Sequence, residues 1–101
     1  MIKVMIERHV KPGRDLAPSL QELRAALISH FQGYLTGETM VSTDDDSVIV
    51  TIGTWLSLEH WERWKTSETR VKICQRMEPL LVEEPEIRTF KLVATEPIQT
   101  R

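Results

Sequence analysis

The sequence predicts an α+β fold whose elements follow the order β-α-β-β-α-β. Three observations support it. Apolar and polar residues alternate over residues 2–10, leucines recur at helical spacing over residues 16–31, and two β-rich segments flank a polar turn at residues 43–46. A second helical region and a last strand complete a single domain over residues 1–95, followed by a tail at residues 96–101.

The first strand and the first helix carry the clearest patterns. β-Branched residues at alternate positions predict a strand over residues 2–10 with one buried face. A turn at residues 11–14 leads to Asp15, a candidate helix N-cap, and the helix is expected to end near Gly33, where glycine can close it. The predicted buried stripe of this helix comprises Leu16, Leu20, Leu23, Leu27 and Phe31.

The remaining elements follow from turns and caps. Residues 34–42 and 47–55 read as a β-hairpin around the polar turn. Ser57 is expected to cap a short helix through Trp64, and Ser67 a second helix to about residue 78, where Pro79 stops it. The apolar stripe predicted for this second helix contains Val71, Cys74, Met77 and Leu81, and the last strand is expected over residues 86–95.

This order predicts a ferredoxin-like arrangement, in which four antiparallel strands carry helices on one face. The third strand has apolar residues on both faces, Val48, Val50 and Ile52 on one and Ile49 and Trp55 on the other. A strand that is apolar on both faces needs cover on both sides. We therefore expect a homodimer in which a second copy covers the open sheet face.

Composition narrows the class of protein. The 101 residues are 41% hydrophobic and 28% charged with a net charge of −2, which is typical of a globular protein and argues against a nucleic-acid partner. No apolar run approaches the ~20 residues of a membrane span, and no signal peptide is apparent. The single cysteine, Cys74, excludes an intrachain disulfide framework and favours a cytoplasmic location.

The segment that contains all three tryptophans resembles a known family. Its order and spacing are similar to those of the antibiotic biosynthesis monooxygenase (ABM) family, and the resemblance covers about residues 2–93. The residues that carry it are the strand end Thr51-Ile52-Gly53-Thr54-Trp55, then Ser57, Glu59, Trp64, the helix from Ser67, and the stretch from Pro79 to Pro85.

The resemblance implies a dimeric α+β barrel, in which two ferredoxin-like units pack through their sheets and a pocket lies between sheet and helices. Members of the family include monooxygenases that oxidise polycyclic phenols or quinols with O₂ and no cofactor, haem-degrading enzymes and isomerases. One fold thus carries several chemistries, so activity has to be argued from side chains.

The haem-degrading branch of the family offers a test. It uses an asparagine on the first strand, a tryptophan in the second helical region and a histidine ten residues further on. Trp64 matches the tryptophan, but Glu7 stands at the asparagine position and Cys74 at the histidine position. These two departures argue against haem, although a cysteine thiolate can bind haem iron. The alternative is that Cys74 fills the core.

Glu7 and His9 are the candidate catalytic residues. They lie two apart on the first strand and therefore share a face. A carboxylate beside an imidazole can take a proton from a phenol, the step that prepares it to give an electron to O₂. Glu7 is the better candidate base because it is more central and matches a family pocket position. The alternative is that both are polar residues on a partly hydrated face.

Five further residues are candidates for substrate binding. Trp64 could form a wall for a flat substrate or pack against the sheet, and these alternatives stay open. Arg70 could hold an anionic group or remain solvated, and Tyr34 could donate its hydroxyl or pack under a loop. His60 and Cys74 complete the set, with a surface position and a core position as their respective alternatives.

Several sites are excluded by the sequence. The acidic run at residues 44–46 lacks the further ligands of a calcium loop, and no cluster has metal-ligand spacing or a nucleotide-binding pattern. We therefore expect no metal and no cofactor. The predicted function is a cofactor-independent monooxygenase acting on an aromatic, phenolic or quinol-like molecule, with a non-catalytic binding or dimerisation module, or a haem protein, as the alternatives.

Overall fold

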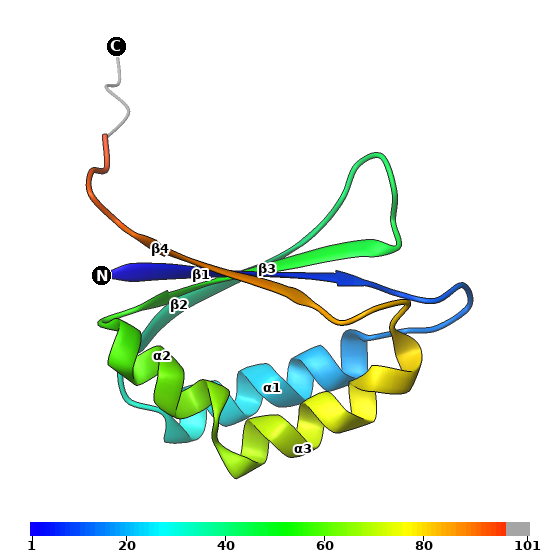
Figure 1. The fold of residues 1–101 in the computed structure, drawn as a ribbon, viewed down its shortest axis with the longest axis horizontal. Helices are drawn as coiled ribbons and strands as arrows, with labels where there is room; N and C mark the ends of the chain where they lie inside the picture. The colour runs from blue at the N-terminus through cyan, green and yellow to red at the C-terminus, as the bar shows by residue number, and fades with distance from the viewer. Residues whose placement is uncertain (97–101) are drawn as a thin grey trace.

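The computed structural model describes residues 1–96, except for the side chain of His30. Residues 97–101 of the predicted tail lie outside the described residues. Figure 1 shows the elements in the predicted order. They are β1 (Ile2–His9), α1 (Ala17–His30), β2 (Tyr34–Val41), β3 (Val48–Trp55), α2 (Leu58–Lys65), α3 (Glu68–Met77), a 3₁₀ turn η1 (Glu78–Leu80) and β4 (Glu86–Lys91).

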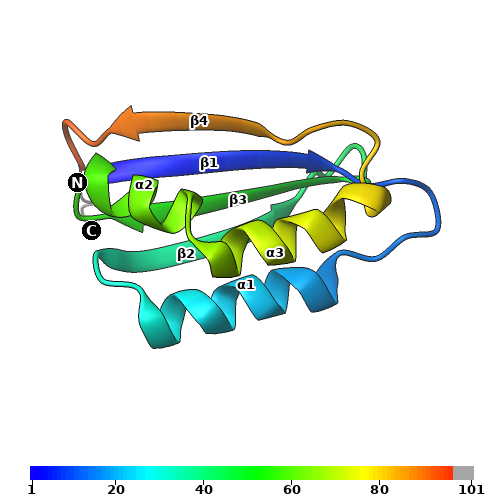
Figure 2. The same cartoon turned by 60° about the horizontal axis from the view of Figure 1, so that its bottom comes forward.

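The four strands form one antiparallel sheet in the order β2-β3-β1-β4. The helices lie on one side of this sheet, with α1 and α3 next to each other, and leave the other side open (Figures 1 and 2). This is the predicted ferredoxin-like α+β fold. No helix in the described part of the chain is long and apolar enough to cross a bilayer.

The register of the central strand β1 decides which side chains face the helices. Ile2, Val4, Ile6 and Arg8 are buried, whereas the residues between them are only half-buried. On β3, the residues opposite this buried set are Trp55, Gly53, Thr51 and Ile49, and paired residues share a face. The helix face of the sheet is therefore built from these two alternating sets.

The core lies between this face and the helices. The predicted stripe of α1 is confirmed, since Leu16, Leu20 and Leu23 are buried and Leu27 and Phe31 pack against the core. The stripe predicted for α3 is wrong in part: Ile73 and Met77 are buried, whereas Val71 is 40% exposed and Cys74 is half-buried. Ile73 and Met77 are four residues apart and so lie on one side of the helix.

Two predicted helix caps are present in the structure. The Ser57 hydroxyl accepts a hydrogen bond from the backbone N–H of His60 at 3.3 Å, and the Ser67 hydroxyl accepts one from that of Arg70 at 3.2 Å. At α1 the N-cap is Leu16, and Asp15 instead accepts from the backbone N–H of Ala17. β4 ends at Lys91, four residues earlier than expected.

Gly33 forms the turn between α1 and β2. Its φ of +87° is one that residues with a Cβ rarely adopt, and a Cβ at this position would overlap the His60 side chain. The Gly33 carbonyl also accepts a hydrogen bond from the backbone N–H of Leu56 at 2.8 Å. The glycine thus lets the start of β2 lie against the beginning of α2.

We expect Gly33→Ala to lower the free energy of unfolding by more than the ~1–2 kcal/mol that the left-handed backbone alone costs, because the new methyl group also meets His60. Gly13→Ala is the matched control: its φ is +74°, but nothing lies within 4 Å of an added Cβ. Urea unfolding of both variants measures the difference. Equal losses would contradict the importance of the His60 contact.

Candidate functional site

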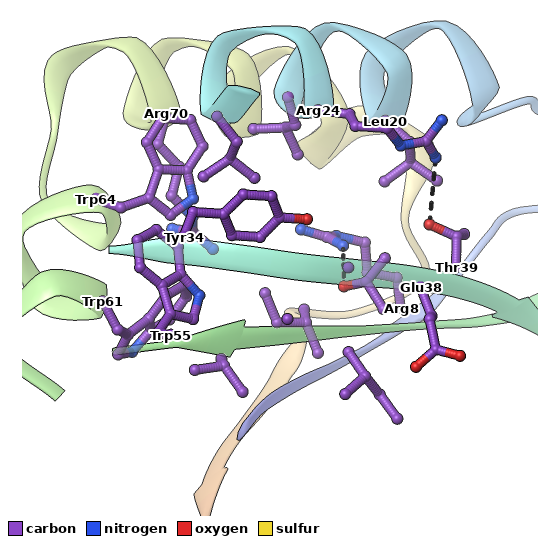
Figure 3. A pocket seen from close by; sticks show the side chains of 18 residues that line it. Arg8, Leu20, Arg24, Tyr34, Glu38, Thr39, Trp55, Trp61, Trp64 and Arg70 are labelled. Carbon is purple, nitrogen blue, oxygen red and sulfur yellow. Dashed lines mark hydrogen bonds between the residues drawn. The ribbon is translucent and has the colours of Figure 1, made fainter. Parts of the chain in front are cut away.

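A cavity of about 80 Å³ lies between the helix face of the sheet and the helices (Figure 3). Side chains from β1, α1, β2, β3, α2 and α3 all reach it, so every layer of the fold contributes. It is small beside the ~300–1,000 Å³ of sites that enclose a drug-sized ligand. A ligand larger than a single small ring therefore requires side chains at the cavity to move.

Four aromatic residues, Tyr34, Trp55, Trp61 and Trp64, line one side of the cavity and are called the aromatic wall here. Tyr34 meets Trp55 edge to face with ring centres 5.2 Å apart, and Trp55 meets Trp61 in the same way at 6.0 Å. Trp64 is 3% exposed and packs in the core, and it also lines the cavity. The wall presents an apolar surface built of rings that pack edge to face.

The floor of the cavity contains a pair of glycines. Gly37 and Gly53 face each other across β2 and β3. A Cβ at Gly37 would overlap the Tyr34 hydroxyl, and one at Gly53 would come within 3.2 Å of Trp55 Nε1. The absence of side chains at these two positions therefore leaves room for Tyr34 and Trp55 to pack against the sheet.

Arg8 is the buried charged residue at this site. Its side chain is 2% exposed, and its Nη1 donates to Thr51 Oγ1 at 3.5 Å, the long limit of a hydrogen bond (Figure 3). Within the described part of the chain, its Nε has no hydrogen-bond partner. Burial lowers the pKa of Arg8, a charge on Cys74 opposes this, and Arg70 adds to the lowering by repulsion.

Two more arginines border the cavity. The Arg70 guanidinium lies over the Trp61 ring at 5.4 Å from its centre, a cation–π contact. Arg24 reaches from α1 to Thr39 on β2, where its Nη2 donates to Oγ1 at 3.4 Å (Figure 3). Arg70 therefore lines the cavity together with Arg8 and Arg24, and the three arginines give this part of the cavity a positive charge.

The Tyr34 hydroxyl points from the aromatic wall toward the side of the cavity where Arg8 and Arg24 lie (Figure 3). Burial raises the pKa of Tyr34, and the charge of Arg24 partly opposes that rise. The phenol thus stays protonated near neutral pH and can donate a hydrogen bond to a bound molecule. Its position agrees with the candidate role in substrate binding.

Glu7 and His9 do not lie at this cavity. The expectation that Glu7 stands beside Trp64 between sheet and helices is wrong, because its side chain shares the open face with Lys3 and Met5 while Arg8 points inward. Glu7 and His9 do lie side by side as predicted, with His9 Nε2 2.8 Å from Glu7 Oε2. Glu83 is 3.7 Å from the other ring nitrogen.

His60 and Cys74 also lie away from the cavity lining. The Nδ1 of His60 is 2.7 Å from the Ser57 hydroxyl, and its ring lies against Gly33, so the residue fastens the α2 cap. Cys74 is half-buried against the core near Arg8. The predicted substrate contacts of these two residues therefore have no support in the lining of the cavity.

The sequence contained a signal for Arg8 that the analysis of motifs missed. Strict alternation along residues 2–10 places Ile2, Val4, Ile6 and Val10 on one face, and Arg8 occupies the one charged position in that series. The sequence prediction singled out Glu7 and His9, which lie on the opposite face of the strand. Among the described residues, no group of His, Cys, Asp or Glu is arranged to hold a metal ion.

The model of a family described as ABM, antibiotic biosynthesis monooxygenase, matches residues 1–76. The chain belongs to this family. Among curated proteins nothing matches the chain. The β1 side chain that lines the cavity at this end is that of Arg8 and not that of Glu7, the residue matched by sequence to the asparagine of the haem-degrading branch.

Solved structures of ABM proteins share this fold. A putative antibiotic biosynthesis monooxygenase from Caulobacter crescentus CB15 is 17% identical with a TM-score of 0.85 and covers 92% of this chain and 90% of its own. SnoaB, a cofactor-independent oxygenase from Streptomyces nogalater, is 16% identical with a TM-score of 0.78 and covers 96% and 98%. At these identities the likeness shows the fold alone.

The Glu7–His9 pair predicts a pH dependence of stability in this ABM protein. The hydrogen bond with Glu7, aided by the charges of Glu7 and Glu83, raises the pKa of His9 above 6.5. The stabilisation is therefore complete below pH 6.5 and is lost as the pH rises through the raised pKa. In urea unfolding across this range, we expect the wild type to lose stability relative to His9→Gln. A constant difference between the two proteins would contradict the ion pair.

Proposed function

We propose that this protein is a cofactor-independent monooxygenase that oxidises a phenolic or quinol-like aromatic molecule with O₂. The observation that carries the proposal is the aromatic wall, an apolar surface that lines a cavity between the sheet and the helices of an ABM protein. The likeness to SnoaB, a cofactor-independent oxygenase, supports the same reaction type. Trp64, Tyr34 and Arg70 are the proposed contacts of the substrate.

The reaction balances without an external reductant. A phenol with hydrogen on its para carbon first loses its hydroxyl proton, and the phenolate then transfers an electron to O₂. The resulting radicals combine at the para carbon, and loss of water leaves a quinone. One oxygen atom enters the product and the other leaves as water, while all four electrons come from the ring. The cavity's contribution is to orient the ring and stabilise the anion.

Two locations for the chemistry compete in this proposal. The first is the cavity, where Tyr34 is the hydrogen-bond donor and Arg8 stabilises the anion. The second is the open sheet face, where Glu7 acts as the base with His9 beside it and a second copy encloses the substrate. The cavity is favoured because the described residues of one chain already enclose it on several sides.

A non-catalytic binding module is the second candidate function. The small volume of the cavity favours it, as does the position of the carboxylate and imidazole pair on the other face of the sheet. Haem binding has less support because Glu7 and Cys74 stand at the positions where the haem-degrading branch has asparagine and histidine. Saturable binding of a quinol with no O₂ uptake would select the binding module.

The oxygenase proposal predicts O₂ uptake with a panel of single-ring and two-ring phenols and quinols. We expect Tyr34→Phe to lower kcat/KM by about tenfold, since one hydrogen bond to a developing anion is worth roughly 1.5 kcal/mol or more. Glu7→Gln is the matched control on the open face and is expected to retain the wild-type rate. Loss of activity in Glu7→Gln alone would transfer the reaction to the open face.

We also propose that the protein is a homodimer that packs through the open face of the sheet, in the cytoplasm as its single cysteine suggests. This face carries the half-buried residues Val48, Val50 and Ile52 of β3 and the exposed residues Met40 and Phe90 of its neighbours. Apolar side chains on three strands of an open sheet face are typical of an interface, and on this face they border the polar residues of β1.

Val50→Glu is expected to convert the dimer to a monomer, because it places an unpaired charge at the centre of that interface. Val71→Glu, at an exposed position on α3, is the control and is expected to leave the association unchanged. Sedimentation velocity over a range of protein concentrations measures both variants. A wild type that sediments as a monomer at every concentration would contradict the proposal.

A further inference from the structure

The cavity contains a buried arginine that has no carboxylate partner among the residues that the structure describes. Arg8 is 2% exposed, yet no carboxylate in residues 1–96 forms an ion pair with it. Its Nε has no hydrogen-bond partner among those residues, and its contact with Thr51 is long. Burial of an unpaired charge is strongly unfavourable, so a folded protein that retains one requires an explanation.

The surroundings make the charge less favourable still. Arg24 and Arg70 also line the cavity, and neither forms an ion pair with a carboxylate of the described residues. Arg70 lowers the pKa of Arg8 by repulsion. The nearby Cys74 side chain offsets part of this through its charge and a hydrogen bond with Arg8, but the Arg8 Nε still has no hydrogen-bond partner among the described residues.

Glu38 belongs to the lining of the cavity but does not neutralise this charge. It pairs with Ile52, which in turn pairs with Met5, so its side chain belongs to the open face of the sheet. In Figure 3 its carboxylate is directed away from Arg8 and Arg24. No carboxylate of the described residues therefore neutralises the arginines of the cavity, which leaves that role to the negative group of a bound molecule.

We propose that the cavity binds an aromatic anion, a carboxylate or a phenolate, whose negative group pairs with Arg8 and whose ring lies against the aromatic wall. The distribution of side chains fits such a molecule, with Trp61 and Trp64 at one end and Arg8 and Arg24 at the other (Figure 3). Guanidinium groups bind carboxylates and phenolates through charge-assisted hydrogen bonds. The claim that this anion is the substrate rests on the proposed function, whereas binding of the anion can be measured without turnover.

The proposal has a consequence for the reaction. A phenol bound beside Arg8 ionises at a lower pH than in water, because a nearby positive charge favours its anion. Such a site prepares the phenolate without a basic side chain in the cavity, and the proton passes to solvent. Arg8 then has the role that the sequence analysis assigned to Glu7.

The first test measures binding under anaerobic conditions, so that no oxidation contributes. Benzoate and its neutral isostere benzamide are titrated into the protein while tryptophan fluorescence is recorded. We expect benzoate to bind at least about tenfold more tightly than benzamide, and Arg8→Met to abolish that preference. Equal affinities in the wild type, or an unchanged preference in Arg8→Met, would overturn the proposal.

Controls separate this loss from a general loss of structure. Removal of a buried unpaired charge relieves its desolvation, so Arg8→Met is expected to have a Tm equal to or above that of the wild type. Arg63→Met, on the solvent side of α2 where Arg63 pairs with Glu59, is the matched variant and is expected to bind both probes normally. Arg8→Lys retains a charge without the planar fork and is expected to regain part of the preference for benzoate.

The second test distinguishes a phenolate from a carboxylate. 4-Nitrophenol is titrated with the protein across pH, because its anion absorbs visible light and its neutral form does not. If the site takes phenolates, the bound probe ionises at a lower pH than the free probe, and Arg8→Met removes that shift. Selection of benzoate without a shift in 4-nitrophenol ionisation assigns a carboxylate. The absence of both effects would overturn the proposal.

The outcomes also keep this inference apart from the proposed oxygenase function. Benzoate selectivity that depends on Arg8, without O₂ uptake for any phenol or quinol, would sustain the anion site and reject the oxygenase. O₂ uptake with neutral quinols in a protein that shows no anion selectivity would do the reverse. A single set of purified variants therefore decides both questions.

Discussion

The register of β1 is the constraint on which the rest of the structure depends. This strand lies between β3 and β4, so its alternation is imposed on both neighbours. It directs Val4 and Ile6 into the core, and with the same parity it directs Arg8 into the cavity. A shift by one residue would bury Glu7 and expose the apolar set, so the hydrophobic effect that fixes the core also fixes the arginine.

The cavity combines two surfaces of opposite character that come from different parts of the chain. The aromatic wall depends on the Gly37–Gly53 pair, which leaves room for the Tyr34 and Trp55 side chains against the sheet. The arginines come from β1, α1 and α3, elements that meet only in the folded protein. An apolar surface next to a desolvated positive charge suits a ring that carries a negative group.

The sequence predicted well what depends on local pattern. Serine caps at Ser57 and Ser67 and the stripe of α1 follow from the chemistry of single turns, and the structure confirms them. The α3 stripe was partly wrong because two apolar rows, those of Val71 and Ile73, compete on that helix, and only packing against α1 and the sheet selects Ile73. The buried face of a helix can thus be predicted from sequence where a single row of apolar residues dominates.

The candidate site was less predictable for a physical reason. A carboxylate and an imidazole two residues apart form a pair in any strand, so Glu7 and His9 attract attention whichever face they occupy. An arginine in a series of β-branched residues interrupts the apolar pattern. Burial of its charge is unfavourable for folding, and that free-energy cost makes the residue informative about function. Natural proteins retain such costs chiefly at functional sites, where stability is given up for a ligand that restores the balance.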